Sequence, residues 1–333
     1  MEIRVERKAR VSVIVPMYNV EKYLYRSVQS LFTQDLEDIE LIFVNDSSTD
    51  NTLDTLGKLL QGYDREDISV KIISHETNQG VAVARNTAID AVSGEYIYYL
   101  DADDYIEPDT LSALYNTAVN SQADVVGCDW FLTFEKNERK IYQPEIKDGE
   151  DAFKKMAKGA MRWNLWMFLV KTTIYRENGL KFIPNMNMGE DMMLMMKAVL
   201  LSERMVMVRS CCYHYVQSNP QSLTKRFEIA LQQIGANIES IAQFLKLKGR
   251  EDLLKYISFL KLTIKQPFLI SADSKDYEIW NNTFPEANLY VGANDDLTWY
   301  ASLLQRFAKH RFYWGLKMYY WLVVRFLYGV IYR

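Results

Sequence analysis

Three carboxylates, Asp101, Asp103 and Asp104, directly follow the apolar run Tyr96–Leu100. A run of this kind suits a strand that is buried on both faces, with the carboxylates at its end. Asp101 and Asp103 are two positions apart and would project to the same side of an extended chain. Two carboxylates on one side suit a hard divalent cation that also binds phosphate oxygens. The alternative is a solvated acidic turn, ended by Pro108.

The elements that must position these carboxylates alternate between strand and helix. Apolar runs predict strands at Val11–Pro16, Ile39–Val44 and Ser69–Ser74, and helical spacing of apolar residues predicts helices at Glu21–Phe32, Leu53–Leu60 and Val81–Val92. Together with Tyr96–Leu100, this alternation is typical of a parallel, doubly wound α/β sheet.

Polar residues follow each of these four strands. They are Pro16, Tyr18 and Asn19, then Asn45 and Asp46, then Asn78 and Gly80, and then Asp101 and Asp103. Ligands of doubly wound sheets bind at the carboxyl ends of the strands, so one crevice is expected to gather these loops. Neither Gly-x-Gly-x-x-Gly nor a Walker A sequence follows the first strand, which disfavours a dinucleotide site and a P-loop.

Composition limits the class of protein. The chain has 333 residues, 49% of them hydrophobic and 25% charged, which is enough apolar material for one large or two ordinary domains. A net charge of −4 argues against a general nucleic-acid binder. Three cysteines, two of them adjacent, fit a reducing cytosol better than a disulfide framework. The charged N-terminus predicts no secretory signal, and no spanning helix is expected.

The second half of the chain changes character. Glu190 and Asp191 precede the Met-rich helix predicted at Met192–Leu201, where carboxylates favour the helix dipole and could simply cap it. From Phe227 to about Ile270 the apolar spacing is helical throughout, and a shift in composition near residue 225 predicts a domain boundary.

The segment 297–333 contains no Asp or Glu, and basic residues alternate in it with Trp, Tyr and Phe. Basic, aromatic, amphipathic helices of this kind lie in membrane interfaces. The alternative is a helix that docks on the rest of the protein or on a second copy.

Five segments, in this order and at this spacing, resemble family 2 glycosyltransferases of the GT-A fold, of the type that makes bacterial cell-surface polysaccharide. They are Val11–Asn19, Val44–Asp50, Asn78–Gly80 with Arg85 and Asn86, Asp101–Asp104, and Gly189–Asp191. The resemblance implies an α/β GT-A fold with a doubly wound, mixed and mostly parallel sheet. It covers about residues 9–225 and, with the composition shift near 225, predicts a nucleotide-sugar-binding catalytic domain at 1–225. The apolar spacing after that boundary predicts a helical region at 226–296, which is followed by the basic aromatic segment at 297–333.

The resemblance also implies the ligands and the roles of residues. It implies a nucleotide-sugar donor, usually a UDP-sugar, and Mg²⁺ or Mn²⁺. Asp46 is expected to hydrogen-bond the base, and Asp101 to approach the ribose. Asp103 is expected to hold the metal, and Asp191 matches the catalytic base. The expected nucleotide-sugar pocket comprises Pro16, Tyr18, Asn19, Asp46, Asn78, Gly80, Arg85, Asp101, Ala102 and Asp103.

Other positions are candidates for the metal and the acceptor. Gln217 stands where many members have Arg near the diphosphate, and His214 is a candidate to substitute as a metal ligand. Trp163, Trp166 and Glu190 are candidates for the acceptor site, because aromatic faces stack on sugars; the alternative for the two Trp residues is a packed core beneath the base.

Two departures from the family pattern affect donor choice. Asn45 stands where the family commonly has Asp, and Ser47 where it commonly has Gly. Asp46 is retained, so base recognition is still expected.

The sequence thus predicts an inverting, metal-dependent hexosyl- or N-acetylhexosaminyltransferase. It would move a sugar from a UDP-sugar to a hydroxyl of a glycan or lipid-linked saccharide, on the cytoplasmic face of the cell membrane. A nucleotidyltransferase is disfavoured because no Gly-rich basic loop follows the first strand. A non-catalytic nucleotide-sugar-binding or scaffold subunit is the other alternative, and the presence of both Asp103 and Asp191 argues against it.

Overall fold

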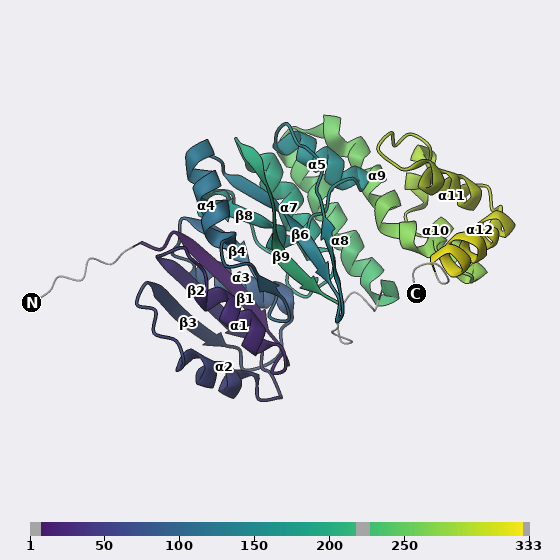
Figure 1. Cartoon of the computed structure of the whole chain (residues 1–333). Coiled ribbons are helices and arrows are strands. Elements are labelled where there is room, and N and C mark those ends of the chain that lie inside the picture. The colour runs from purple at the N-terminus through teal and green to yellow at the C-terminus, as the bar shows by residue number, and fades with distance from the viewer. Residues whose placement is uncertain (1–7, 218–226, 329–333) are drawn as a thin grey trace, which may run out of the picture. The chain divides into compact units, whose positions relative to one another are not determined.

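A computed structural model describes residues 8–217 and 227–328, which form two compact units (Figure 1). One unit contains the residues up to Asp151 together with Trp163–Ile241, and the other contains Ala152–Arg162 together with the residues from Ala242 onward. The boundary predicted at 225/226 lies outside the described residues, as does the end of the predicted C-terminal segment, 329–333.

The first unit is built on one nine-stranded sheet with the order β3-β2-β1-β4-β8-β6-β9-β5, in which β7 pairs with β6. The strands are β1 (Val11–Met17), β2 (Ile39–Asn45), β3 (Ile68–Ser74), β4 (Tyr96–Tyr99), β5 (Tyr105–Ile106), β6 (Val125–Thr133), β7 (Glu138–Ile141), β8 (Phe168–Lys171) and β9 (Met205–Val216).

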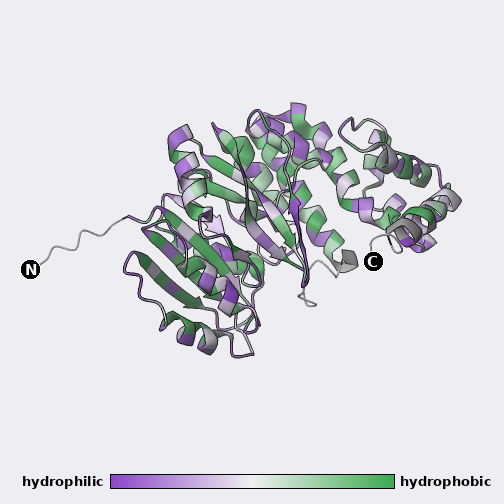
Figure 2. Ribbon diagram, viewed as in Figure 1, coloured by the Kyte–Doolittle hydropathy of each residue, from purple (hydrophilic) through white to green (hydrophobic). Residues whose placement is uncertain are grey.

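The parallel half of the sheet positions the predicted site. β1 pairs in parallel with β2 on one side and with β4 on the other, and β2 pairs in parallel with β3. The direction of winding therefore reverses between β1 and β4, and ligands of doubly wound sheets bind at such a switch point, beyond the carboxyl ends of the strands. Nearly every residue of β1, β2 and β4 is buried, as their continuous apolar runs predict. Figure 2 shows these strands as largely hydrophobic.

The other half of the sheet is mixed. β8 pairs antiparallel with both β4 and β6, and β9 pairs in parallel with β6. β8 arises from the aromatic stretch after Trp163, for which the sequence predicts no strand, while β9 runs without interruption from Met205 to Val216. The predicted fold class, a mixed and mostly parallel doubly wound sheet followed by helices, is confirmed.

Helices cover this sheet. They are α1 (Leu24–Phe32), α2 (Thr52–Leu60), α3 (Val81–Ala91), α4 (Thr110–Ser121), α5 (Gly149–Lys158), α6 (Thr172–Asn178), α7 (Glu190–Leu201) and α8 (Phe227–Leu247). α3 packs on β1 and β2, and α4 packs on β6 and β9. α5 and α8 each have residues in both units.

The second unit is helical. Its further helices are α9 (Leu254–Lys265), α10 (Ser274–Asn282), α11 (Trp299–Lys309), α12 (Tyr313–Tyr319) and a π-helix at Tyr320–Tyr328. The buried Lys265 ammonium donates to the carbonyl of Thr283 at 2.7 Å and to Asn288 Oδ1 at 2.6 Å, and lies 4.2 Å from the Trp280 ring centroid. None of the described helices combines the length and the apolar character needed to cross a bilayer.

A buried carboxylate joins the parallel strands. Glu40 lies on β2 and is 1% exposed. It accepts hydrogen bonds from Ser12 Oγ on β1, from Ser93 N and Oγ at 2.8 Å each, and from Lys71 Nζ on β3 at 2.6 Å. Burial would raise the pKa of Glu40, but Lys71, Ser12 and Ser93 together hold the pKa below its ordinary value.

We therefore expect Glu40→Gln to destabilise the protein by about 2–4 kcal/mol, because an amide offers an NH₂ group to partners that are all donors. Since folding lowers the pKa of Glu40, this stabilisation is fully present above the unfolded pKa of 4.5 and is lost as the pH falls through the folded value. Melting temperatures of the two proteins should differ at pH 7 and converge in acid. Gln at the exposed Glu66 is the control, and an equal effect of the two variants would contradict this role.

Candidate active site

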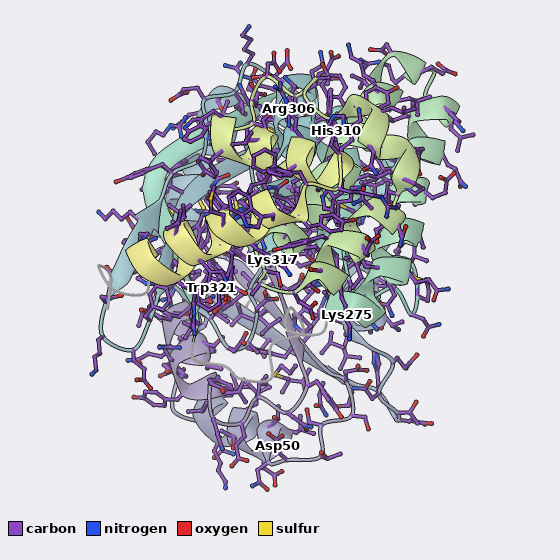
Figure 3. All side chains as sticks on the ribbon, turned by 90° about the vertical axis from the view of Figure 1, so that its right-hand side faces the viewer. Asp50, Lys275, Arg306, His310, Lys317 and Trp321 are labelled. Carbon is purple, nitrogen blue, oxygen red and sulfur yellow. The ribbon has the colours of Figure 1, made fainter. Side chains whose placement is uncertain are left out.

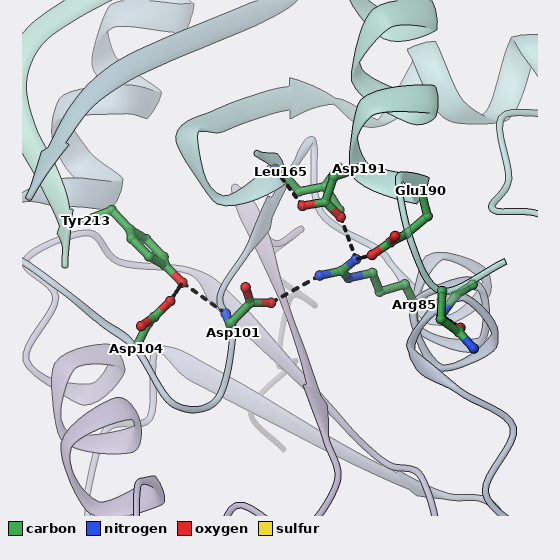
Figure 4. A network of polar contacts seen from close by, with 9 residues as sticks. Arg85, Asp101, Asp104, Leu165, Glu190, Asp191 and Tyr213 are labelled. Atoms are coloured by element: carbon green, nitrogen blue, oxygen red, sulfur yellow. Dashed lines mark hydrogen bonds and ion pairs between the residues drawn. The ribbon is translucent and has the colours of Figure 1, made fainter. Parts of the chain in front are cut away.

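One buried guanidinium joins three of the predicted carboxylates (Figure 4). Arg85 Nη1 donates to Asp191 Oδ1 at 2.7 Å and to Glu190 Oε1 at 2.9 Å, and its Nη2 donates to Asp101 Oδ1 at 3.1 Å. Asp101 follows β4, whereas Glu190 and Asp191 form the first turn of α7. The sequence-distant carboxylates are thus brought to one place by Arg85.

The sequence of α3 explains how an arginine is accommodated there. Arg85 is 4% exposed, and the neighbouring buried positions Ala82, Ala84 and Ala88 leave room for its long side chain. The guanidinium also lies 5.7 Å from the ring centroid of Phe182. A guanidinium can bridge several carboxylates because its five N–H donors point outward in one plane.

Burial and charge set the protonation of this cluster. Burial, reinforced by the charge of Asp191 and opposed by Arg85, raises the pKa of Glu190 to about 8. Burial also raises the pKa of Asp101 to about 6, although Arg85 counteracts this effect. Burial would lower the pKa of Arg85, but its three carboxylate neighbours raise the pKa above its ordinary value. The raised pKa favours the protonated form of Glu190, which would reduce the negative charge beside Arg85.

The segment Asp101–Asp104 is a turn and not a continuation of the strand. β4 ends at Tyr99, and the N–H of Asp104 donates to the carbonyl of Asp101 at 2.9 Å. The prediction that Asp101 and Asp103 project to the same side assumed an extended chain. That assumption is wrong, because these residues lie in a turn that leads into β5. The buried Ala102 occupies the middle of this turn.

A tyrosine from β9 anchors the turn. Tyr213 Oη donates to Asp104 Oδ2 at 2.6 Å and accepts a hydrogen bond from Asp101 N at 3.3 Å (Figure 4). The other Asp104 oxygen accepts from Val216 N at 2.7 Å, and Asp104 is 1% exposed. Burial raises the pKa of Asp104 well above its ordinary value. Asp104 is thus a structural residue, and no sequence pattern pointed to its partner Tyr213, which lies 109 positions away.

Asp46 makes contacts that its sequence motif did not predict. Its Oδ1 pairs with His75 Nδ1 at 2.7 Å and accepts from Gln79 N at 2.9 Å, and its Oδ2 accepts from Gly80 N at 2.7 Å. Asn78 Nδ2 donates to the Asp46 carbonyl at 3.2 Å. The 3% exposed Asp46 therefore fixes the loop that precedes α3, and any contact with a nucleobase would have to share its oxygens.

The first strand ends close to the second. Asn19, which has a left-handed φ of 53°, accepts a hydrogen bond through Oδ1 from Thr49 N at 2.8 Å. Pro16 is partly buried at the end of β1, and Tyr18 is 48% exposed. The loops after β1 and β2 are thus tied together, and an exposed aromatic ring is available beside them.

His214 lies on β9, directly after Tyr213, and pairs in register with Tyr105. Its ring is stacked between Tyr105 and Phe131, with centroids 4.1 Å and 4.4 Å away. Its Nε2 pairs with Glu107 Oε1 at 2.7 Å and its Nδ1 pairs with Thr133 Oγ1 at 3.1 Å. Both ring nitrogens therefore have partners, an arrangement that suits a structural histidine better than the predicted metal ligand.

The predicted acceptor residues are differently placed. Trp166 is 2% exposed and stacks on Tyr213 with centroids 4.2 Å apart, so it belongs to the core, as the alternative interpretation held. Trp163 is partly exposed, three residues earlier. Glu190 is 8% exposed and directed at Arg85, so it contributes to the electrostatics of the cluster rather than to an open surface.

The carboxylates present fit a divalent cation that is shared with a diphosphate. Among residues 8–217 and 227–328, no three His, Cys, Asp or Glu side chains are grouped so that they could hold a metal by themselves. Mg²⁺ at phosphate sites commonly takes one or two protein carboxylates and completes its shell with phosphate oxygens and water. Asp103, partly exposed in the turn, and Asp101, 30% exposed, supply that donor chemistry.

A family model described as glycosyl transferase family 2 matches residues 12–189, which include the carboxyl ends of β1, β2, β3 and β4. The chain belongs to glycosyltransferase family 2. EpsH of Bacillus subtilis, named a putative glycosyltransferase, is 30% identical over 71% of this chain and 69% of its own length. EpsJ of the same organism, named an uncharacterized glycosyltransferase, is 32% identical over 65% of this chain, but the match spans 63% of EpsJ.

Solved structures share the fold. The fragment 1–349 of S. aureus TarS superposes with a TM-score of 0.61 at 19% identity, covering 92% of each chain. The mannosyltransferase PcManGT of Pyrobaculum calidifontis superposes with a TM-score of 0.53 at 18% identity, covering 93% of this chain and 88% of its own. At these identities the likeness concerns the family 2 fold alone.

Replacement of Arg85 tests the cluster. Arg85→Met would leave Asp101, Glu190 and Asp191 together without a counter-charge, so we expect a loss of about 3–5 kcal/mol in the free energy of unfolding. Urea unfolding followed by circular dichroism measures this loss, with Met at the exposed Arg204 as the matched control. A loss within about 1 kcal/mol of the control would show that Arg85 does not hold the carboxylates together.

Proposed function

We propose that this family 2 protein is an inverting, metal-dependent glycosyltransferase. It moves a hexosyl or N-acetylhexosaminyl group from a UDP-sugar to a hydroxyl of a glycan or lipid-linked saccharide in cell-surface polysaccharide synthesis. The observation that carries the proposal is the Arg85 bridge, because it holds Asp101, at the end of β4, beside Asp191, at the start of α7. A donor over the strand ends and a base on α7 would then face one crevice.

The role of Asp191 follows from its contacts. One carboxylate oxygen is held by Arg85, the other accepts a long 3.4 Å hydrogen bond from Leu165 N, and the side chain is 18% exposed. That second oxygen can take the proton of an acceptor hydroxyl as the hydroxyl attacks the sugar. Attack from the face opposite the leaving diphosphate inverts the anomeric centre in one displacement.

The donor side is supported by the strand-end loops and by the relatives. TarS has been crystallised with UDP-GlcNAc, and PcManGT with GDP-Man and Mn²⁺. In this chain Asp103, with Asp101 beside it, would hold Mg²⁺ or Mn²⁺. When bound, the cation offsets the negative charge that develops on the leaving diphosphate. Tyr18, 48% exposed, is available to stack on the nucleobase, and Asn45 replaces a common family Asp beneath it.

A screen of UDP-sugars that measures UDP release with and without Mn²⁺ tests this proposal. Two isosteric variants then distinguish the proposed base, Asp191, from the proposed metal ligand, Asp103. We expect Asp191→Asn to lower kcat by about 10²–10⁴-fold while UDP binding is retained, since only the proton acceptor is lost. We expect Asp103→Asn to weaken Mn²⁺-dependent UDP binding as well as turnover. Asn at the exposed Asp64 is the control.

Unchanged turnover of Asp191→Asn would show that another group is the base. Metal-dependent UDP binding without turnover for any donor and acceptor would instead favour the non-catalytic binding or scaffold subunit.

We further propose that the C-terminal part of the second unit contacts the cytoplasmic face of the cell membrane. Large apolar side chains on α11, α12 and the π-helix are exposed: Trp299 by 77%, Trp314 by 66%, Trp321 by 56% and Leu322 by 57%. Figure 3 shows Lys317 and Trp321 on the same helical stretch, with Arg306 on α11 and His310 directly after it. Aromatic rings interleaved with cations suit the headgroup region of an anionic bilayer.

The charge of this surface favours contact with an anionic membrane over contact with a second copy of the chain. No Asp or Glu occurs in residues 297–333, whereas the whole chain carries a net charge of −4. The described cations include Lys309, Lys317 and Arg325, all exposed. Such a surface is attracted to anionic lipid and repelled by other cationic surfaces like itself.

Co-sedimentation with vesicles measures this contact. We expect binding to phosphatidylglycerol-containing vesicles that weakens with salt, and little binding to pure phosphatidylcholine. The double change Trp314→Ser and Trp321→Ser should reduce binding roughly tenfold or more, because two large rings no longer partition. Ser at Tyr142, 67% exposed in the first unit, is the control. Salt-independent self-association instead of vesicle binding would identify the surface as an interface between copies.

A further inference from the structure

The segment 185–189 leads into the proposed base and contains two residues with a left-handed backbone. Asn185 and Gly189 both have left-handed backbone conformations, with φ of 65° and 76°, and no side chain caps the N-terminus of α7. Asp191 follows Gly189 by two residues. Its position therefore depends on what the segment 185–189 contacts.

Helix α8 supplies those contacts from one of its faces. Gln233 Oε1 accepts a hydrogen bond from Asn187 N at 3.0 Å, and Asn237 Nδ2 donates to the Met188 carbonyl at 2.9 Å. Ile234 packs beneath Gly189, where an added Cβ would lie 3.3 Å from its Cγ1. Residues 233 and 237 are four apart, so they share a face of the helix.

The same face continues along α7. Ser240, one turn after Asn237, accepts a hydrogen bond through Oγ from Lys197 Nζ at 2.7 Å. Asn237 is fully buried, whereas Asn side chains are mostly exposed in folded proteins. α8 thus makes one polar contact with α7 and two with the segment that precedes it.

The opposite side of segment 185–189 is fixed to α3. Asn187 Oδ1 accepts a hydrogen bond from Ala82 N at 3.0 Å, three residues before Arg85. A Cβ at Gly80, where φ is 86°, would lie 2.3 Å from Asn187 Nδ2, so glycine is needed for this approach. Segment 185–189 is therefore held between α3 and α8, and Asn187 contacts both.

We propose that Gln233 and Asn237 of α8 are positioning residues for the glycosyl transfer, which set the place of Asp191 relative to Arg85 through the backbone of Asn187 and Met188. This inference rests on the proposed function, in which Asp191 is the base. A base displaced by about 1 Å can lose roughly 10²-fold in rate even when the donor still binds.

The test compares three variants of the full chain. Gln233→Leu removes the acceptor for Asn187 N, Gln233→Glu retains an acceptor oxygen at similar reach, and Gln232→Leu makes the same change at the exposed neighbouring position. We expect Gln233→Leu to lower kcat by about 10–100-fold with the KM of the donor and the affinity for UDP changed less than about twofold. Gln233→Glu should restore most of the rate, and Gln232→Leu should leave it unchanged.

Hydrogen–deuterium exchange provides a readout that does not need turnover. The peptide that covers residues 185–191 should exchange faster in Gln233→Leu than in wild type or Gln232→Leu. Equal exchange, or equal kcat in wild type and Gln233→Leu, would overturn the proposal. An absence of turnover in the wild type, with faster exchange in Gln233→Leu, would instead overturn the proposed function. It would still show that Gln233 holds segment 185–189 in place.

Discussion

The proposed active site depends on the ion pairs of one buried residue, Arg85. Its guanidinium is the counter-charge that lets Asp101, Glu190 and Asp191 lie together in a largely dry environment, at distances of 2.7–3.1 Å. Without it, desolvation and mutual repulsion would separate the carboxylates or protonate them. Because Arg85 lies on α3, the elements that hold α3 also determine the geometry of the site. Those elements include the loop fixed by Asp46 and the segment that contains Asn187.

The motifs that contain Asp46 and Asp104 therefore have a structural role beside the chemical role proposed for them. Asp46 fixes the loop before α3 by accepting from two backbone N–H groups and pairing with His75. Asp104 fixes the turn Asp101–Asp104 by accepting from Tyr213 Oη and Val216 N. These residues leave Asp103, Asp101 and Asp191 as the carboxylates with exposed oxygen atoms. Rigid support by neighbouring groups is what holds reacting groups at useful distances.

Much of the parallel half could be predicted from the sequence, because β1, β2 and β4 are buried on both faces and read as continuous apolar runs. The order of the five motifs likewise identified the family. The antiparallel strand β8 could not be predicted, since the aromatic run around Phe168 suits a core helix or loop equally well. The turn at Asp101–Asp104 and the burial of Trp166 depend on β5 and β9, and the Gln233–Asn187 contact joins residues 46 apart. Local patterns carry no signal for such partners.

A crystal structure of the protein with UDP and Mn²⁺ tests the central claim most directly, namely that the Arg85 cluster joins the donor and the base in one crevice. We expect the diphosphate at the carboxyl ends of β1 and β4, Mn²⁺ on Asp103, and Asp191 still bound to Arg85 and facing the diphosphate. UDP at a site remote from Asp103, or a bound state in which Arg85 and Asp191 have separated, would contradict the account.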